Sequence, residues 1–212
     1  MWLKAADPGA PAVLYLHGAR WNLTGSVTRI ERWRKLGFNV LAIDYRGFGQ
    51  STDVVPSETL AYEDADAAWD YLGRIAPGKP RIIVGHSLGG VIATELAYRR
   101  PEAAGVVLEA TFTSVKDMIA NTAWSFLPVD LILTQNFDAL KRIPDVKVPV
   151  VVAHGTRDQV VPYEMGEKLY AAAKAPKVFV KVEGGSHHNL SSVGFDQYRA
   201  AIVQLLKGNG RI

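Results

Sequence analysis

Short runs of apolar, β-branched residues recur along the chain, and helix-like segments separate most of them. The runs are apolar at every position, a pattern typical of strands that are covered on both faces of a sheet. The predicted strands are Ala12 to Leu16, Asn39 to Ile43, Arg81 to Val84, Gly105 to Leu108, Val148 to Ala153 and Val178 to Val182. We therefore expect an α/β fold, with a mostly parallel central sheet of about six strands and helices on both faces.

The intervals carry helix signals, among them Ser57 in position to cap a helix and Gly or Pro near several predicted ends. The predicted helices are Thr24 to Leu36, Glu58 to Ile75, Val91 to Arg100, Tyr163 to Lys174 and Gly194 to Lys207. No internal repeat or low-complexity linker interrupts the 212 residues. We expect one domain, residues 1–212.

One interval, between Leu108 and Val148, is longer than a single crossover helix requires. We expect residues 111–145 to form a small helical cap above the strand ends. Trp124 and Phe126 within it either pack into the core or form an apolar wall over a binding cleft, and the two roles are compatible.

The formal net charge is only +3, and no long block of like charge occurs. Nucleic acid is therefore not expected as a partner. Arg29, Arg32, Arg34 and Lys35 gather on one predicted helix, and we interpret them as its solvated face. The absence of cysteine excludes disulfides, thiolate metal sites and a cysteine nucleophile.

The sequence shows neither a signal peptide nor a membrane span, which favours a cytoplasmic protein. We expect a monomer or a weak homo-oligomer. Only eleven residues precede the first predicted strand, so the sheet either starts late or lacks N-terminal strands. Missing strands would leave an exposed edge that invites association.

The segment Gly85-His86-Ser87-Leu88-Gly89-Gly90 lies between a predicted strand and a predicted helix. In that context a Gly-x-Ser-x-Gly pattern indicates a nucleophile elbow, in which a tight turn presents the serine hydroxyl outward. The pattern by itself is common enough to arise by chance. Its position between strand and helix makes Ser87 a candidate nucleophile.

A serine nucleophile needs a base and an acid that orients the base. Asp158 follows the strand Val148 to Ala153, and His187 and His188 follow the last predicted strand. Loops that leave parallel strands at their carboxyl ends open on the same edge of the sheet, so these residues can converge on Ser87. Glu109 is the alternative acid, and the choice between the two histidines stays open on position alone.

Six segments extend this pattern: "LYLHG", "DYRGFGQS", "VGHSLGG", "LEATFTS", "VAHGTRDQVVP" and "GGSHHN". Through them nearly the whole chain resembles the compact serine hydrolases of the α/β-hydrolase superfamily. The resemblance implies Ser87 as nucleophile, Asp158 as acid and His187 as base. It also implies an oxyanion hole formed by the backbone N–H groups of Ala19 and Leu88.

For several other residues the sequence gives weaker indications of a functional role. Arg20 and Trp21, like Trp124 and Phe126, are candidate substrate contacts. His17, His86, His154 and His187 lie at one rim, but their spacing matches no metal motif, so we expect no metal and no cofactor.

Charged residues elsewhere are interpreted as structural. We expect Asp44 and Arg46 to brace a loop. The acidic residues of the helix Glu58 to Ile75 are expected on its solvated face: Glu63, Asp64, Asp66 and Asp70.

The sequence thus predicts a serine hydrolase that cleaves a small carboxylic ester or thioester through an acyl-enzyme on Ser87. A peptidase, a lipase or an acyltransferase on the same fold remains an alternative, because specificity lies in the cap and the cleft. A non-catalytic binding protein with the same fold is a further alternative. Ser87 disfavours dehalogenase chemistry, which requires an aspartate at the elbow.

Overall fold

The computed structural model describes residues 1–20, 22–121 and 135–204. Its strands form one sheet in the order β1-β3-β2-β4-β5-β6-β7. All neighbouring pairs are parallel except β1 with β3. The bounds are β1 Trp2–Leu3, β2 Ala12–Leu16, β3 Asn39–Ile43, β4 Arg81–His86, β5 Gly105–Glu109, β6 Val150–Gly155 and β7 Lys177–Val182. The predicted α/β fold with a mostly parallel sheet is confirmed.

The strand β1 was not predicted, and it raises the described sheet from about six strands to seven. It consists only of Trp2 and Leu3, which pair with Leu41 and Val40 of β3. Two residues are too short to show a period of their own, so only their backbone pairing identifies them.

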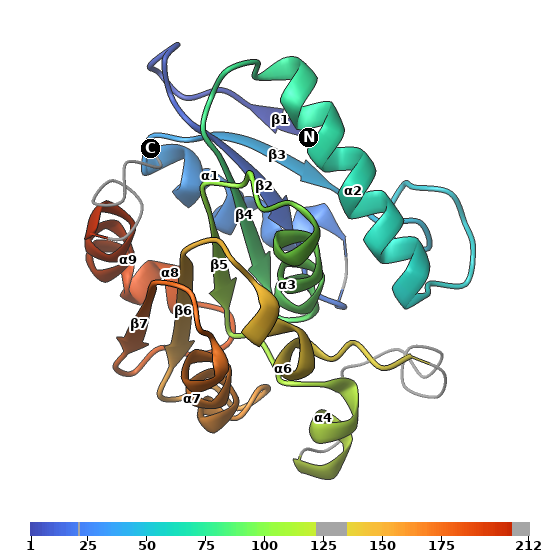
Figure 1. Ribbon diagram of the computed structural model, residues 1–212, viewed down its shortest axis with the longest axis vertical. Coiled ribbons are helices and arrows are strands. Elements are labelled where there is room, and N and C mark those ends of the chain that lie inside the picture. Colours follow the sequence, from blue (N-terminus) through green and yellow to red (C-terminus); the bar gives the residue numbers. More distant parts are fainter. Residues whose placement is uncertain (21, 122–134, 205–212) are drawn as a thin grey trace.

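Helices cover both faces of the sheet (Figure 1). Helices α2, α3 and α7 pack on one face, and α1, α8 and α9 pack on the other. The bounds are α1 Val27–Lys35, α2 Glu58–Ile75, α3 Leu88–Arg99, α4 Val115–Asn121, α6 Ala139–Arg142, α7 Tyr163–Ala172, α8 Leu190–Val193 and α9 Phe195–Ile202, with 3₁₀ turns at Leu23–Ser26 and Ile143–Asp145. Among these described helices, none combines the length and apolarity that crossing a membrane requires.

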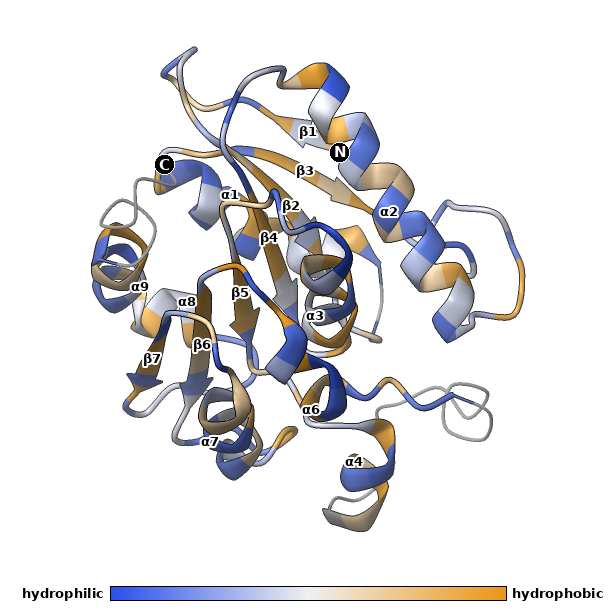
Figure 2. Cartoon of the chain, in the orientation of Figure 1, coloured by the Kyte–Doolittle hydropathy of each residue, from blue (hydrophilic) through white to orange (hydrophobic). Residues whose placement is uncertain are grey.

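The alternation of side chains along each strand divides the core into two layers. Leu14 and Ile83 face the layer under α2 and α3, whereas Val13 and Ile82 face the layer under α1. Figure 2 shows hydrophobic colour along the central strands and a mixture of polar and apolar positions on α2. The sheet is therefore apolar on both faces, as its uninterrupted apolar runs predict.

Several helix boundaries differ from those predicted, and one of them lies at the candidate site. Helix α3 begins at Leu88, directly after Ser87, rather than at Val91. The last predicted helix, Gly194 to Lys207, corresponds to α9, which begins at Phe195 and ends at Ile202; residues 205–212 lie outside the described residues. The predicted N-cap is confirmed, because the Ser57 side chain accepts a hydrogen bond from Leu60 N at 3.2 Å.

Parts of the predicted cap lie within the described residues. Figure 1 shows α4 beyond the arrowheads of β4 and β5, on the side where the parallel strands end. Trp124 and Phe126 fall in residues 122–134, outside the described part of the chain. The cap at 111–145 and the apolar wall stay predictions.

Candidate active site

Ser87 occupies a sharp turn between β4 and α3. Its backbone has φ 56° and ψ −119°, a left-handed conformation that a residue with a Cβ rarely adopts. The Ser87 N–H donates to Glu109 O at 2.9 Å, and Gly90 N donates to Ser87 O at 3.0 Å. These bonds hold the serine in a strained turn, as a nucleophile elbow requires.

Two glycines allow the elbow to pack closely. A Cβ on Gly85 would collide with the backbone of Gly89, and a Cβ on Gly89 would collide with the carbonyl of Leu16 on β2. Glycine at both positions lets α3 start directly against the ends of β4 and β2. The sequence pattern around Ser87 therefore has a steric cause.

Asp158 and His187 meet at the carboxyl ends of β6 and β7. His187 Nδ1 lies 2.9 Å from Asp158 Oδ2, across 29 positions of sequence. A carboxylate only accepts, so Nδ1 carries the proton and donates, which leaves Nε2 as the basic nitrogen. This is the tautomer that a general base for serine needs.

The Asp158 carboxylate is held by several donors, and its side chain is fully covered. Val160 N and Val161 N donate to Oδ1 at 2.8 and 2.9 Å, and His154 Nε2 lies 3.4 Å from Oδ2. Burial raises the pKa of Asp158, but the hydrogen bonds from His154, His187 and Val161 N–H outweigh burial and hold it well below its ordinary value. The acid is therefore ionised at neutral pH.

Two further side chains bind the backbone carbonyl of His187. His86 Nε2 donates to the His187 carbonyl at 2.9 Å, and Arg29 Nη2 donates to the same carbonyl at 3.3 Å. Arg29 Nη2 also donates to His188 O at 3.2 Å. Because His86 immediately precedes Ser87, its bond ties the elbow to the histidine loop.

A cavity of about 550 Å³ opens at this edge of the sheet. Ser87 and His187 both line it, at 4% and 6% exposure. Within the described part of the chain no hydrogen bond joins the Ser87 hydroxyl to the His187 ring. Catalytic bonds of this kind often tighten only when substrate is bound. The structure therefore places Ser87 and His187 at one cavity, with Asp158 bonded to the His187 ring.

The predicted oxyanion donors flank the same place. Ala19 lines the cavity, and Leu88 is the first residue of α3, where backbone N–H groups have no acceptor inside the helix. The loop that contains Ala19 is braced by Asp44, whose Oδ1 accepts from Leu23 N at 2.7 Å. Arg20 lines the cavity as well, whereas Trp21 lies outside the described residues.

Neither alternative triad residue takes the position that was considered for it. The Glu109 carboxylate is buried under α1 and accepts from Trp33 Nε1 at 3.1 Å, away from the His187 ring nitrogen that Asp158 holds. Burial raises the pKa of Glu109 to about 7, although Arg29 and the Trp33 bond act against it. His188 is exposed, and no hydrogen bond joins it to Asp158 among the described residues, so His187 is the histidine that the geometry favours.

Arg46 braces the loop after β3 against α2, as expected. Arg46 Nε lies 2.7 Å from Asp64 Oδ1, and Arg46 Nη2 lies 2.7 Å from Glu63 Oε2. Asp66 and Asp70 also pair with arginines, at 3.0 Å each. These four acids are thus paired with arginines rather than only solvated.

Three of the four rim histidines, His17, His86 and His154, bond the backbone through one ring nitrogen each. His17 Nδ1 donates to Gly18 O at 2.7 Å, and His154 Nε2 donates to Val161 O at 3.0 Å. Within the described ranges, no three His, Cys, Asp or Glu residues form a group that could hold a metal ion.

Sequence reasoning missed the roles of His86, His154 and Arg29. Arg29 in particular is only 8% exposed, so its interpretation as part of a solvated helix face is wrong. The one signal in the sequence was that Arg29 and Arg32 lie three positions apart, which places them on one face of the helix. Their contacts lie about 160 positions away in the sequence, where no local pattern reaches.

Comparison with known proteins identifies the relatives of this chain. Residues 8–137 match the family described as serine aminopeptidase, S33. An uncharacterized protein of Mycobacterium tuberculosis is 36% identical over 181 residues, which cover 84% of this chain and 63% of that protein. The lysophosphatidylserine lipase of Danio rerio is 30% identical over 195 residues, 82% of this chain and 50% of that protein.

The fold is also found among solved structures. The monoacylglycerol lipase of Paleococcus ferrophilus superposes with a TM-score of 0.69 at 21% identity and covers 96% of both chains. The present chain spans less than two thirds of the length of its Mycobacterium tuberculosis relative. Because the family match covers more than half of the sequence, the chain belongs to the serine aminopeptidase S33 family within the α/β-hydrolase superfamily.

Proposed function

We propose that this protein is a serine hydrolase that cleaves carboxylic esters or thioesters through an acyl-enzyme on Ser87. The observation that carries the proposal is the His187 Nδ1 to Asp158 Oδ2 hydrogen bond of 2.9 Å beside a cavity that Ser87 also lines. The similarity to a lipase of Danio rerio supports ester cleavage.

In the first step, His187 Nε2 takes the proton of the Ser87 hydroxyl while Oγ forms a bond to the substrate carbonyl carbon. Asp158 stabilises the imidazolium that results, and the Ala19 and Leu88 N–H groups donate to the tetrahedral oxyanion. The carbon–oxygen or carbon–sulfur bond then breaks, and the leaving group receives the proton from His187. Water repeats the sequence on the acyl-enzyme, which releases the acid and restores Ser87.

The experiment compares hydrolysis of short 4-nitrophenyl esters by the protein and by matched histidine variants. His187→Ala should lose at least about 10³-fold in kcat, and His188→Ala should lose far less, because of these two neighbours it is His187 that is bonded to Asp158. Equal losses in the two variants would contradict the assignment of the base. An acyl thioester assayed in parallel tells which leaving atom is preferred.

The family description favours peptidase activity as a second candidate. Amide cleavage uses the same nucleophile and base, so the two candidates differ only in substrate. Aminoacyl 4-nitroanilides test this directly. Turnover of the anilides above that of the matched esters would assign the protein as a peptidase.

A further inference from the structure

The cavity that contains Ser87 and His187 is lined by cations. Arg20, Arg29 and Arg32 contribute to its wall, and none of its described lining residues is Asp or Glu. A cavity with one sign of charge concentrates ligands of the opposite sign. The wall therefore favours an anionic group on whatever molecule reaches Ser87.

Two of these arginines bind only uncharged partners. Arg29 donates to the carbonyls of Gly25, His187 and His188, at 3.2 to 3.4 Å. Arg32 Nη1 donates to Ser191 Oγ at 3.2 Å. Within the described residues neither guanidinium has a carboxylate within 4.0 Å, so an incoming oxyanion has no internal rival in direct contact.

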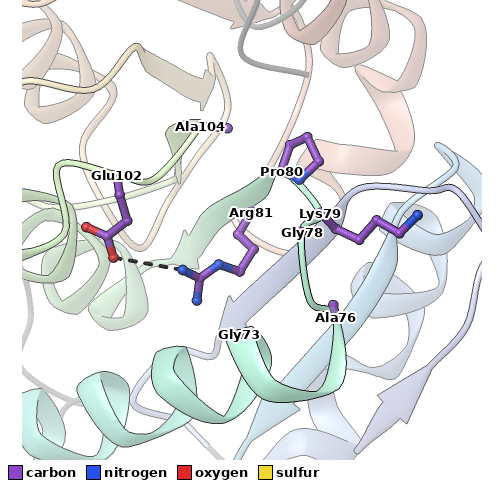
Figure 3. Close-up of a pocket in the computed structure, with 8 residues that line it drawn as sticks. All are labelled: Gly73, Ala76, Gly78, Lys79, Pro80, Arg81, Glu102 and Ala104. Carbon is purple, nitrogen blue, oxygen red and sulfur yellow. Dashed lines mark ion pairs between the residues drawn. The ribbon is translucent and has the colours of Figure 1, made fainter.

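Six arginines elsewhere in the described chain are paired with carboxylates, whereas Arg74, Arg157 and Arg199 have no carboxylate within 4.0 Å among the described residues. Ion pairs of 2.6 to 3.9 Å with carboxylates occur at Arg34, Arg46, Arg81, Arg99, Arg100 and Arg142. A second cavity, of about 460 Å³, makes the contrast clear (Figure 3). Its Arg81 lies 3.9 Å from Glu102 and stacks on Trp69, so its charge is already compensated.

The positive charge of Arg29 acts to lower the pKa values of two buried neighbours, His86 and Glu109. Burial lowers the pKa of His86 well below its ordinary value, and the Arg29 charge lowers it further. The Arg29 charge also acts on Glu109, which lies in the core and does not line the cavity.

Arg29 and Arg32 are three residues apart on α1, so their side chains share one face of the helix. A cavity of about 550 Å³ is of the size that holds a single small ligand. A group bound by these arginines and an ester carbonyl at Ser87 therefore fit within one substrate.

We propose that the substrate ester carries a carboxylate or phosphate group, and that Arg29 and Arg32 bind it. Guanidinium forks match the geometry of both oxyanions. This inference rests on the proposed function, since it names the substrate class of the same site.

Two pairs of esters test the preference for an anionic group and distinguish a carboxylate from a phosphate. Mono-4-nitrophenyl glutarate and its methyl ester differ by a carboxylate on the acyl side. A 1-oleoyl lysophosphatidic acid and 1-monooleoylglycerol differ by a phosphate on the alcohol side. We expect kcat/KM to be about tenfold or more higher for the anionic member of at least one pair at low ionic strength.

Arg32→Gln should reduce that anionic-to-neutral ratio about fivefold to tenfold. Arg34→Gln is the matched control on the same helix, because Arg34 pairs with Glu31 at 2.8 Å and does not line the cavity. The control should keep the ratio. If Arg32→Gln does not fold, Arg32→Lys should show an intermediate ratio, because it keeps the charge and loses the fork.

A ratio near one for both pairs, or a ratio that survives Arg32→Gln, would overturn the inference. If neutral esters are hydrolysed through Ser87 without any charge preference, the proposed anion site is wrong and the proposed function stands. If none of the four esters is hydrolysed and a fluorophosphonate leaves Ser87 unlabelled, the proposed function fails with it.

Discussion

Arg29 donates through Nη2 to the main-chain carbonyl of His187 at 3.3 Å, although 158 positions separate the two residues. The same nitrogen donates to the carbonyl of His188, so one buried guanidinium holds two successive peptide groups. His187, the proposed base, is thus held at its ring by Asp158 and at its backbone by α1. We infer that Arg29 is a positioning residue.

This role predicts a loss in kcat for neutral substrates. Arg29→Gln should lower kcat for a neutral 4-nitrophenyl ester about tenfold with little change in KM, because the base is displaced and not removed. Arg29→Lys, which retains a donor, should recover part of the loss. A fall confined to KM, or an equal fall in both variants, would contradict positioning. Circular dichroism confirms that both variants are folded.

Strain at Ser87 predicts an opposition between stability and activity. The φ of 56° suits glycine, so Ser87→Gly should raise the free energy of unfolding by about 1 kcal/mol, after the entropic cost of glycine is subtracted. Ser87→Ala keeps the strain and should unfold close to the original protein. Urea denaturation of the two inactive variants measures the difference. Equal midpoints would show that the turn is unstrained.

Glu109 predicts a pH dependence of stability. Its pKa rises from 4.5 to about 7 on folding, which corresponds to about 3 kcal/mol. The folded state holds the proton more tightly, so Glu109 makes stability fall as pH rises from about 4.5 to about 7, and the loss persists above that. Glu109→Gln should therefore be more stable than the original protein at pH 8 and equal to it near pH 4.5. The same urea midpoint difference at both pH values would refute this.

The Asp158 carboxylate predicts a large effect on chemistry. Asp158→Asn should lower kcat about 10⁴-fold, because an amide that donates to Nδ1 selects the wrong imidazole tautomer. Glu183→Gln is a suitable control, since Glu183 is an exposed acid that contacts Thr156 in a neighbouring loop. Steady-state ester hydrolysis compares the two. A loss of less than tenfold in Asp158→Asn would exclude Asp158 as the acid.

Much of the scaffold could be predicted because it depends on local patterns. Uninterrupted apolar runs located the six parallel strands, and β2 and β3 have the predicted bounds. Since parallel strands end at one edge, the order of Ser87, Asp158 and His187 was enough to anticipate that they meet. The strand β1 was not predicted because two residues are too few to show a periodic pattern.

The supporting contacts could not be predicted, because they join segments that are distant in sequence. Arg29 and Arg34 belong to the same cluster of basic residues on one predicted helix, which is interpreted from sequence as a solvated face. Only the packing of α1 against the loop after β7 buries Arg29. For the same reason, the bond from His86 to His187 O follows from the assembled sheet and not from the elbow motif.

The most direct measurement of the central claim is covalent labelling of the purified protein with a fluorophosphonate, followed by peptide mass spectrometry. The reagent phosphonylates a serine only where a base and an oxyanion hole activate it. We predict one adduct per chain, on the peptide that contains Ser87, and its loss in Ser87→Ala and in His187→Ala. An unlabelled protein, or an adduct on another residue that persists in Ser87→Ala, would contradict the account.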